Sequence, residues 1–133
     1  MIPFAENAIR GYRRAGIITS LKHFPGHGDV EVDSHQDLPV IKKSKQQLQN
    51  VELLPFKELS SFADTVMTAY VIVPSIDPIN CATLSKNVLD ILRDEIGFEG
   101  LIISDSLVME GLLKNCFSID DAAIKLDCQL LKS

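Results

Sequence analysis

The chain has 133 residues, which is enough for one ordinary domain and too few for two. Hydrophobic residues make up 46% and charged residues 23% of the chain, a balance that excludes a disordered chain, a collagen-like fibre and a disulfide-dense mini-protein. With 13 basic and 18 acidic residues, the net charge of −5 lacks the basic footprint of a nucleic-acid binder. No apolar run approaches the roughly 20 residues of a membrane span. We therefore expect neither a nucleic acid nor a membrane as partner.

The three cysteines, Cys81, Cys116 and Cys128, are odd in number and form no CxxC pair. This usage favours free thiols in a reducing compartment over a secreted disulfide framework. The segment MIPFAENAIRGYRR places its basic residues after its apolar ones, which is the reverse of a secretory signal. These observations predict a cytoplasmic protein.

Helix and strand signals alternate along the chain. Ser44 with Gln47 is a capping box, Pro55 interrupts the apolar pattern, and Ser85 and Ser118 are N-cap candidates. In chain order we expect a helix from Pro3 to about Gly16, a strand over 17–21, helices over 45–53 and around Phe56 and Leu59, a strand over 65–73, a loop from Pro74, a helix from Ser85 to Gly97, a strand over 101–103, a helix from Leu107 to Leu113, and a last helix after Ser118.

This alternation is typical of βα units around a parallel sheet, so the expected fold class is α/β. The chemistry-bearing residues follow the predicted strands, where the carboxyl ends of parallel strands carry the site. Three strands are too few to close an eight-strand barrel, which takes about 250 residues. The chain therefore corresponds either to a small open sheet or to a part of something larger.

The most informative stretch is KHFPGHGDVEVDSH, which holds three histidines and several carboxylates in a loop with turn residues. It has three interpretations. The first is a solvated polar loop. The second is a metal site, although the spacing matches no HExxH pattern, and the third is an acid–base centre. In the third, Asp33 orients the ring of His35 at i and i+2, which leaves the other ring nitrogen to give and take a proton near pH 7.

The second informative stretch is GFEGLIISDSLVM, in which Asp105 follows a predicted buried strand. A carboxylate in this place must be hydrogen-bonded, paired or functional. Asp105 either caps the following helix or serves as a nucleophile toward an electrophilic carbon, as carboxylates do in glycosidases. The segment FPGHG lacks the GK[ST] ending of a phosphate loop, which argues against nucleotide binding.

The two stretches, taken in this order, resemble glycoside hydrolase family 3 and, more narrowly, its β-N-acetylglucosaminidase branch. The matching text is KHFPGHGD, DSH, MTA, PSIDP, ATLS and GFEGLIISDSLVMEG, which together cover residues 17–111. The DSH element separates this branch from the β-glucosidases, which are similar around Asp105 but lack the His–Asp loop. Residues 1–133 then correspond to the C-terminal portion of the catalytic domain, and the implied fold is a partial TIM-like (β/α)8 barrel with its later strands and helices.

The resemblance also implies a function. It is the retaining hydrolysis of terminal β-linked N-acetylglucosamine, typically in peptidoglycan-recycling fragments. Asp105 is then the nucleophile, and His35 oriented by Asp33 is the acid and base. Lys22 and His23 hold sugar hydroxyls. No metal and no organic cofactor is implied.

The chain also departs from the family's pattern. Family members usually have His at position 70, where this chain has Tyr70, and they carry further strands ahead of the position of Met1 that supply sugar-gripping Asp and Arg residues. Two alternatives follow. One is a catalytically incomplete half-barrel that self-associates, binds its complementary half or is a relic. The other is a metal-dependent hydrolase built on the cluster from His23 to Asp37.

Overall fold

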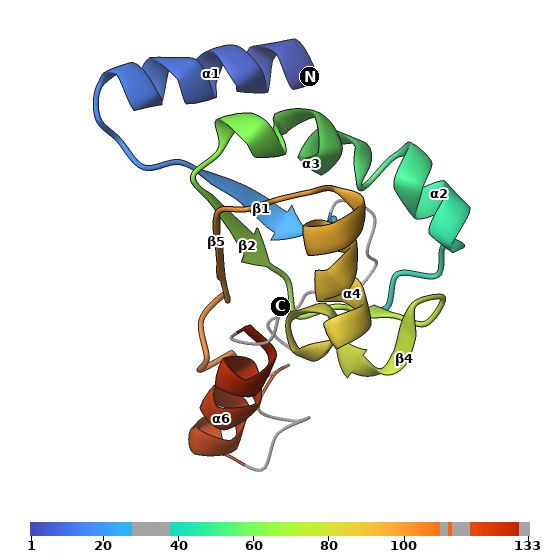
Figure 1. The fold of residues 1–133 in the computed structure, drawn as a ribbon. Helices are drawn as coiled ribbons and strands as arrows, with labels where there is room; N and C mark the ends of the chain where they lie inside the picture. The colour runs from blue at the N-terminus through green and yellow to red at the C-terminus, as the bar shows by residue number, and fades with distance from the viewer. Residues whose placement is uncertain (28–37, 110–111, 113–117, 131–133) are drawn as a thin grey trace.

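A computed structural model describes residues 1–27, 38–109, 112 and 118–130 (Figure 1). Its centre is a three-stranded parallel sheet of β1 (Ser20–Phe24), β2 (Thr65–Thr68) and β5 (Leu101–Ile103), in the order β1-β2-β5. Helical segments connect each strand to the next. The parallel sheet and its helical connections confirm the α/β class predicted from the alternation.

The predicted helices before β2 are confirmed. α1 runs over Ile2–Arg14, α2 over Lys45–Asn50 and α3 over Leu54–Leu59, and a 3-10 turn, η1 (Ser60–Phe62), follows. The side chain of Ser44 accepts the backbone N–H of Gln47, and the Gln47 side chain accepts the backbone N–H of Ser44, so the capping box is formed. Pro55 lies in the first turn of α3, where its missing N–H costs no helical bond.

The first strand lies three residues later than predicted. Ile17 and Ile18 are exposed, at 50% and 77%, and β1 begins only at Ser20, opposite Thr65 of β2. The cause is a pair of hydrogen bonds from the Thr19 backbone N–H and hydroxyl to one carboxylate oxygen of Asp64, each 2.9 Å long, which fixes where the two strands start to pair. Lys22 and His23 therefore lie within the strand and not after it.

The predicted strand over 65–73 is divided in two. β2 ends at Thr68, and the chain leaves the parallel sheet to form β3 (Ile72–Val73), which pairs antiparallel with β4 (Asp77–Cys81). The predicted loop after Pro74 therefore contains a strand. An apolar run alone does not show where a chain changes partners, because both halves of this run are buried.

The elements after β4 follow the predictions closely. A 3-10 turn, η2 (Ala82–Leu84), leads to α4 (Lys86–Asp90), which Ser85 caps by accepting the N–H of Val88, and a π-helical turn, η3 (Ile91–Glu95), follows. Gly97 adopts a φ of 76° at the end of this helix. α6 spans Ile119–Leu130 behind its cap Ser118. The helix predicted over Leu107–Leu113 lies largely outside the described residues.

One face of the sheet is covered and the other is open among the described residues. Phe24, Val66 and Ile102 pack with helix residues such as Leu89 in the main core. On the other face Lys22, Met67 and Ile103 stand side by side, and Lys22 is exposed. Leu101 at the start of β5 is 64% exposed.

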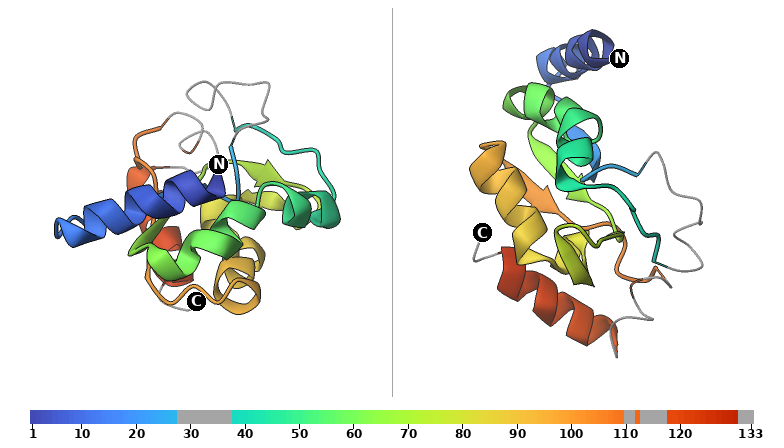
Figure 2. Two further views of the ribbon diagram at one scale, coloured as in Figure 1. Left: turned by 90° about the horizontal axis from the view of Figure 1, so that it is seen from above. Right: turned by 90° about the vertical axis from the view of Figure 1, so that its right-hand side faces the viewer.

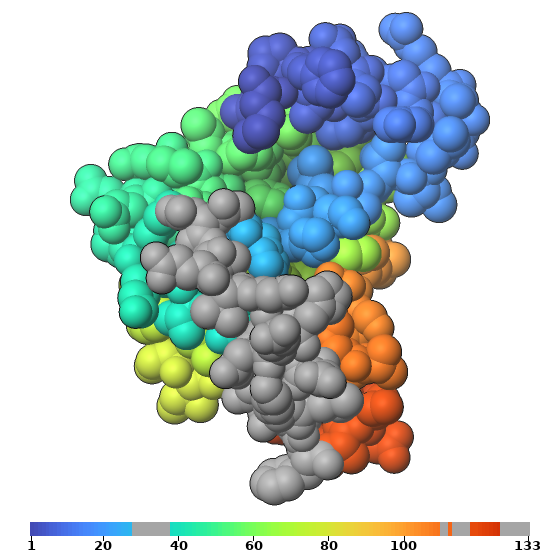
Figure 3. Space-filling model, turned by 180° about the vertical axis from the view of Figure 1, so that it is seen from behind, coloured from blue at the N-terminus to red at the C-terminus, as the bar shows by residue number. Residues whose placement is uncertain are grey.

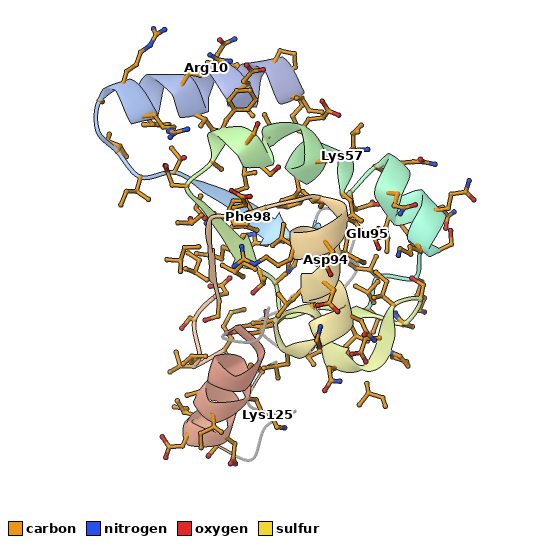
Figure 4. All side chains as sticks on the ribbon, in the orientation of Figure 1. Arg10, Lys57, Asp94, Glu95, Phe98 and Lys125 are labelled. Atoms are coloured by element: carbon orange, nitrogen blue, oxygen red, sulfur yellow. The ribbon has the colours of Figure 1, made fainter. Side chains whose placement is uncertain are left out.

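The elements are arranged along one direction, with α1 at one end, α6 at the other and the sheet between them (Figures 2 and 3). Arg10 of α1, labelled in Figure 4, lies 4.8 Å above the ring of Phe62 and joins this helix to η1. Within the described residues, no helix is long and apolar enough to cross a membrane.

Candidate active site at the carboxyl ends of the strands

The structure brings three of the predicted site residues to the same edge of the sheet. Lys22 and His23 lie on β1, and Asp105 follows the last residue of β5 by two positions. β2 stands between these two strands. Parallel pairing aligns the carboxyl ends of all three strands, so residues more than eighty positions apart in sequence meet here.

His23 and Asp105 face one another across this edge. The Nε2 atom of His23 lies 3.5 Å from Oδ2 of Asp105, and the two side chains are 30% and 32% exposed. The other carboxylate oxygen, Oδ1, accepts the backbone N–H of Ser106 at 2.7 Å. The carboxylate is therefore held from one side and remains accessible to a ligand.

Several neighbours act on the charge state of His23. Burial lowers the pKa of His23 below its ordinary value of 6.5, and the nearby Lys22 and His27 lower it further, while the Asp105 carboxylate acts in the opposite direction. The His27 ring packs edge-on with its centroid 5.9 Å from that of His23. The net effect keeps His23 neutral at pH 7, so its ring offers one donor and one acceptor nitrogen.

Two hydroxyl groups at this edge escaped the sequence analysis as contributors to the site. Thr68 donates to the backbone oxygen of Ile103 at 3.3 Å, and Tyr70 donates to the backbone oxygen of Asp105 at 2.7 Å. The sequence marks Tyr70 only as a departure from the His that the family usually has there. The one signal in the sequence was its position two residues after β2, which cannot show what its hydroxyl contacts.

A cavity of about 570 Å³ opens beside β1 and reaches Lys22 and His23. Its far wall comes from α1 and α3, including Ile2 and Phe56. Glu52 forms an ion pair with Lys43 in this wall, and its Oε2 atom is buried without a hydrogen-bond partner among the described residues. On β1 the cavity is lined by Leu21, Lys22 and His23.

The predicted acid–base pair, Asp33 and His35, lies outside the described residues, as do Asp29, Glu31 and Asp37 of the metal alternative. Among the residues that the structure describes, no three His, Cys, Asp or Glu side chains form a group suited to a metal ion. The structure places Lys22, His23 and Asp105 at one edge of the sheet, and the roles of all five predicted site residues stay predictions.

Residues 2–127 match the glycosyl hydrolase family 3 N terminal domain. The chain belongs to glycosyl hydrolase family 3. This membership confirms the resemblance, and the parallel strands with their helices correspond to part of the family's TIM-like barrel.

Relatives within glycosyl hydrolase family 3 share both sequence and fold with the chain. A β-hexosaminidase of Pseudomonas aeruginosa is 38% identical over 92% of the chain and 36% of its own length. The solved family 3 β-N-acetylglucosaminidase of Paenibacillus superposes with a TM-score of 0.86 at 39% identity, over 91% of this chain and 23% of that one. NagZ of Neisseria gonorrhoeae in complex with N-trifluoroacetyl-D-glucosamine superposes with a TM-score of 0.74 at 36% identity, over 91% of this chain and 34% of that one. The chain therefore spans about a third of the curated relative's length.

Proposed function

We propose that this chain carries the nucleophile side of a β-N-acetylhexosaminidase that releases terminal β-linked N-acetylglucosamine from glycans such as peptidoglycan fragments. The observation that supports the proposal best is the half-exposed Asp105 carboxylate facing His23 at the carboxyl edge of a parallel sheet. The names of the relatives support the substrate class, because they are hexosaminidases and one was solved with an N-acylated glucosamine.

The proposed reaction has two steps with retention of configuration. A carboxylate oxygen of Asp105 attacks the anomeric carbon, while His35 protonates the leaving glycosidic oxygen. The glycosyl ester on Asp105 is then cleaved by water, whose proton passes to His35. Asp33 would orient the His35 ring. The roles of Asp33 and His35 rest on the family resemblance.

Lys22 and His23 would bind sugar hydroxyls beside the nucleophile. Both lie on β1 at the edge where Asp105 is partly exposed, and the neutral ring of His23 can donate one hydrogen bond and accept another. Lys22 is exposed and adds three donors. No step of this reaction calls on a metal ion or an organic cofactor.

The test is the release of nitrophenol from 4-nitrophenyl N-acetyl-β-glucosaminide by the chain and by its Asp105→Asn variant. The variant should lose at least about a thousandfold in kcat, because an amide cannot form the glycosyl ester. Asp90→Asn is the matched control, since Asp90 lies on α4 and pairs with Lys86. Equal turnover by the chain and by Asp105→Asn would overturn the assignment of the nucleophile.

A second candidate is a half-barrel that acts only with a complementary half. The edge of β1 opposite β2 has no partner strand among the described residues, and the cavity beside it is lined by apolar residues such as Ile2 and Leu21. The exposed Leu101 marks the other end of the sheet. Unpaired edges and apolar surface of this kind favour association.

Size-exclusion chromatography tests this second candidate, with and without a polypeptide corresponding to the preceding part of a relative. Co-elution together with restored hydrolysis would support the paired half-barrel, and a new peak of twice the mass without the added polypeptide would indicate self-association. A chain that elutes as a monomer with and without the added polypeptide would exclude both the paired half-barrel and self-association.

The metal-dependent alternative and the cytoplasmic location stay predictions. Unchanged hydrolysis after dialysis against a chelator would exclude the metal-dependent reaction. Fractionation of the source cells, with detection of this chain, would test the location that its cysteine pattern favours.

A further inference from the structure

The hydrogen bonding between β2 and β5 continues past the end of the strands through side chains. Backbone pairing ends at Met67 opposite Ile103. Beyond it the hydroxyl of Thr68 donates to the backbone oxygen of Ile103, and the hydroxyl of Tyr70 donates to the backbone oxygen of Asp105. The two donors and the two acceptors are each two residues apart, so the contacts follow the spacing of the strands.

Tyr70 is firmly held in place. It is 2% exposed and packs in a second hydrophobic cluster, whose fully buried members include Leu112 and, on α6, Ala122. The residue before it, Ala69, donates its backbone N–H to Phe24 at the end of β1 and accepts the hydroxyl of Thr83 through its carbonyl. The tyrosine hydroxyl thus projects from a backbone that is fixed on both sides.

We propose that Tyr70 is a positioning residue for Asp105, whose backbone it holds so that the carboxylate faces His23. The inference rests on the proposed function, in which Asp105 is the nucleophile. The end of β2 is bonded to the end of β1 through Ala69 and to the segment after β5 through Tyr70, so it sets the separation of His23 and Asp105.

The remaining contacts of Asp105 are too few to replace this hold. Among the described residues, its carboxylate has one hydrogen bond, from the N–H of its neighbour Ser106, and the His23 ring at 3.5 Å. A bond to an adjacent residue moves with the segment and cannot fix it to the sheet. The Tyr70 hydroxyl is a contact with a residue 35 positions away.

The experiment is an NMR titration of the histidine side chains in the 133-residue chain, which has only three histidines. Tyr70→Phe removes the hydroxyl and keeps the ring. Tyr12→Phe is the matched control, because Tyr12 is the other tyrosine and is 54% exposed on α1. Asp105→Asn is the reference in which His23 has lost the whole influence of this carboxylate.

Asp105 raises the pKa of His23 against the effects of burial, Lys22 and His27. We therefore expect Tyr70→Phe to lower the pKa of His23 by a few tenths of a pH unit, to a value between the unaltered chain and Asp105→Asn. Tyr12→Phe should leave it unchanged. A His23 titration in Tyr70→Phe that superimposes on the unaltered chain, or that moves upward, would overturn the proposal.

Urea denaturation shows whether Tyr70→Phe is folded, and the unaltered chain provides a second measurement if it is not. The Tyr70 hydroxyl proton, buried and bonded, should exchange slowly and give a nuclear Overhauser effect to the backbone N–H of Ser106. A hydroxyl proton in fast exchange with water would contradict the contact on which the positioning role depends.

Hydrolysis separates this inference from the proposed function. In an active chain Tyr70→Phe should lower kcat about tenfold with KM within twofold, because a displaced nucleophile still leaves the sugar-binding residues in place. A shifted His23 titration in a chain that hydrolyses nothing, either alone or with the polypeptide of the preceding part of a relative, would refute the proposed function and retain the positioning role. Full activity and an unchanged titration in Tyr70→Phe would refute the positioning role alone.

Discussion

Asp77 at the start of β4 and Asp105 just after β5 are both aspartates of the motif text PSIDP and ISDS, yet the structure uses them in opposite ways. Asp77 is 8% exposed and accepts hydrogen bonds from the backbone N–H groups of Ile79 and Asn80, from the Asn80 amide and from the Ser85 hydroxyl. The side chain of Asp105 is 32% exposed and, among the residues that the structure describes, accepts one such bond, from Ser106.

The difference shows how a carboxylate is assigned to structure or to chemistry. The four donors around Asp77 use most of its acceptor capacity and tie β4 to the cap of α4. Within the described part of the chain, Asp105 keeps free acceptor capacity at the carboxyl edge of the sheet. A carboxylate that the fold has fully satisfied stabilises the fold, and one that is partly satisfied can still bind or attack a substrate.

The largest effect on stability should come from Asp77→Ala, which leaves four donors without their acceptor. We expect it to lower the free energy of unfolding by about 2–4 kcal/mol in urea denaturation. Asp105→Ala should cost less than about 1 kcal/mol, because its surroundings are solvated. Ser85→Ala is the intermediate control, since it removes one bond to Asp77 and the cap of α4. Equal losses for the two aspartates would contradict the comparison.

A smaller effect should appear in the pH dependence of stability. Burial raises the pKa of Asp77, but the hydrogen bonds from Asn80, Ser85 and Ile79 outweigh it and hold the pKa below its ordinary value of 3.8. The unfolded chain therefore binds more protons in acid, so the stabilisation is complete above the unfolded pKa and is lost as the pH falls through the folded one.

Urea denaturation at a series of pH values from about 6 to 3 measures this effect. The unaltered chain should lose stability toward the acid end, and Asp77→Ala should show a shallower loss. A residual slope is expected, because hydrogen bonds from Thr19 also lower the pKa of Asp64. Parallel curves for the two proteins would show that Asp77 does not contribute to the acid sensitivity.

The smallest effect on stability should come from the replacement of Asp90, an aspartate in a solvent-exposed ion pair. Its carboxylate pairs with Lys86 one turn earlier on α4, where both side chains reach solvent. Removal of such a pair by Asp90→Ala should change the free energy of unfolding by less than about 0.5 kcal/mol in urea denaturation. A loss of unfolding free energy as large as that of Asp77→Ala would show that the exposure of an aspartate does not predict how strongly its removal destabilises the fold.

The local signals in the sequence predicted the local structure well. The capping box at Ser44, the caps at Ser85 and Ser118 and the stop at Gly97 all appear where expected, because each depends on residues within one turn. The predictions that were wrong concern element boundaries that depend on residues far apart in the sequence. The hydrogen bonds of Thr19 to Asp64 place the start of β1 later than predicted, and the pairing of β3 with β4 divides the predicted strand over 65–73.

The sequence by itself determined the α/β class, the family and the placement of Lys22, His23 and Asp105 near strand ends, since motif text and periodicity are properties of neighbouring residues. Only the tertiary structure decided that His23 faces Asp105, that the Asp77 carboxylate accepts hydrogen bonds within the fold, and that the Tyr70 hydroxyl donates to the backbone of Asp105. These contacts depend on strand register and on side-chain burial, which arise when segments far apart in the chain pack together.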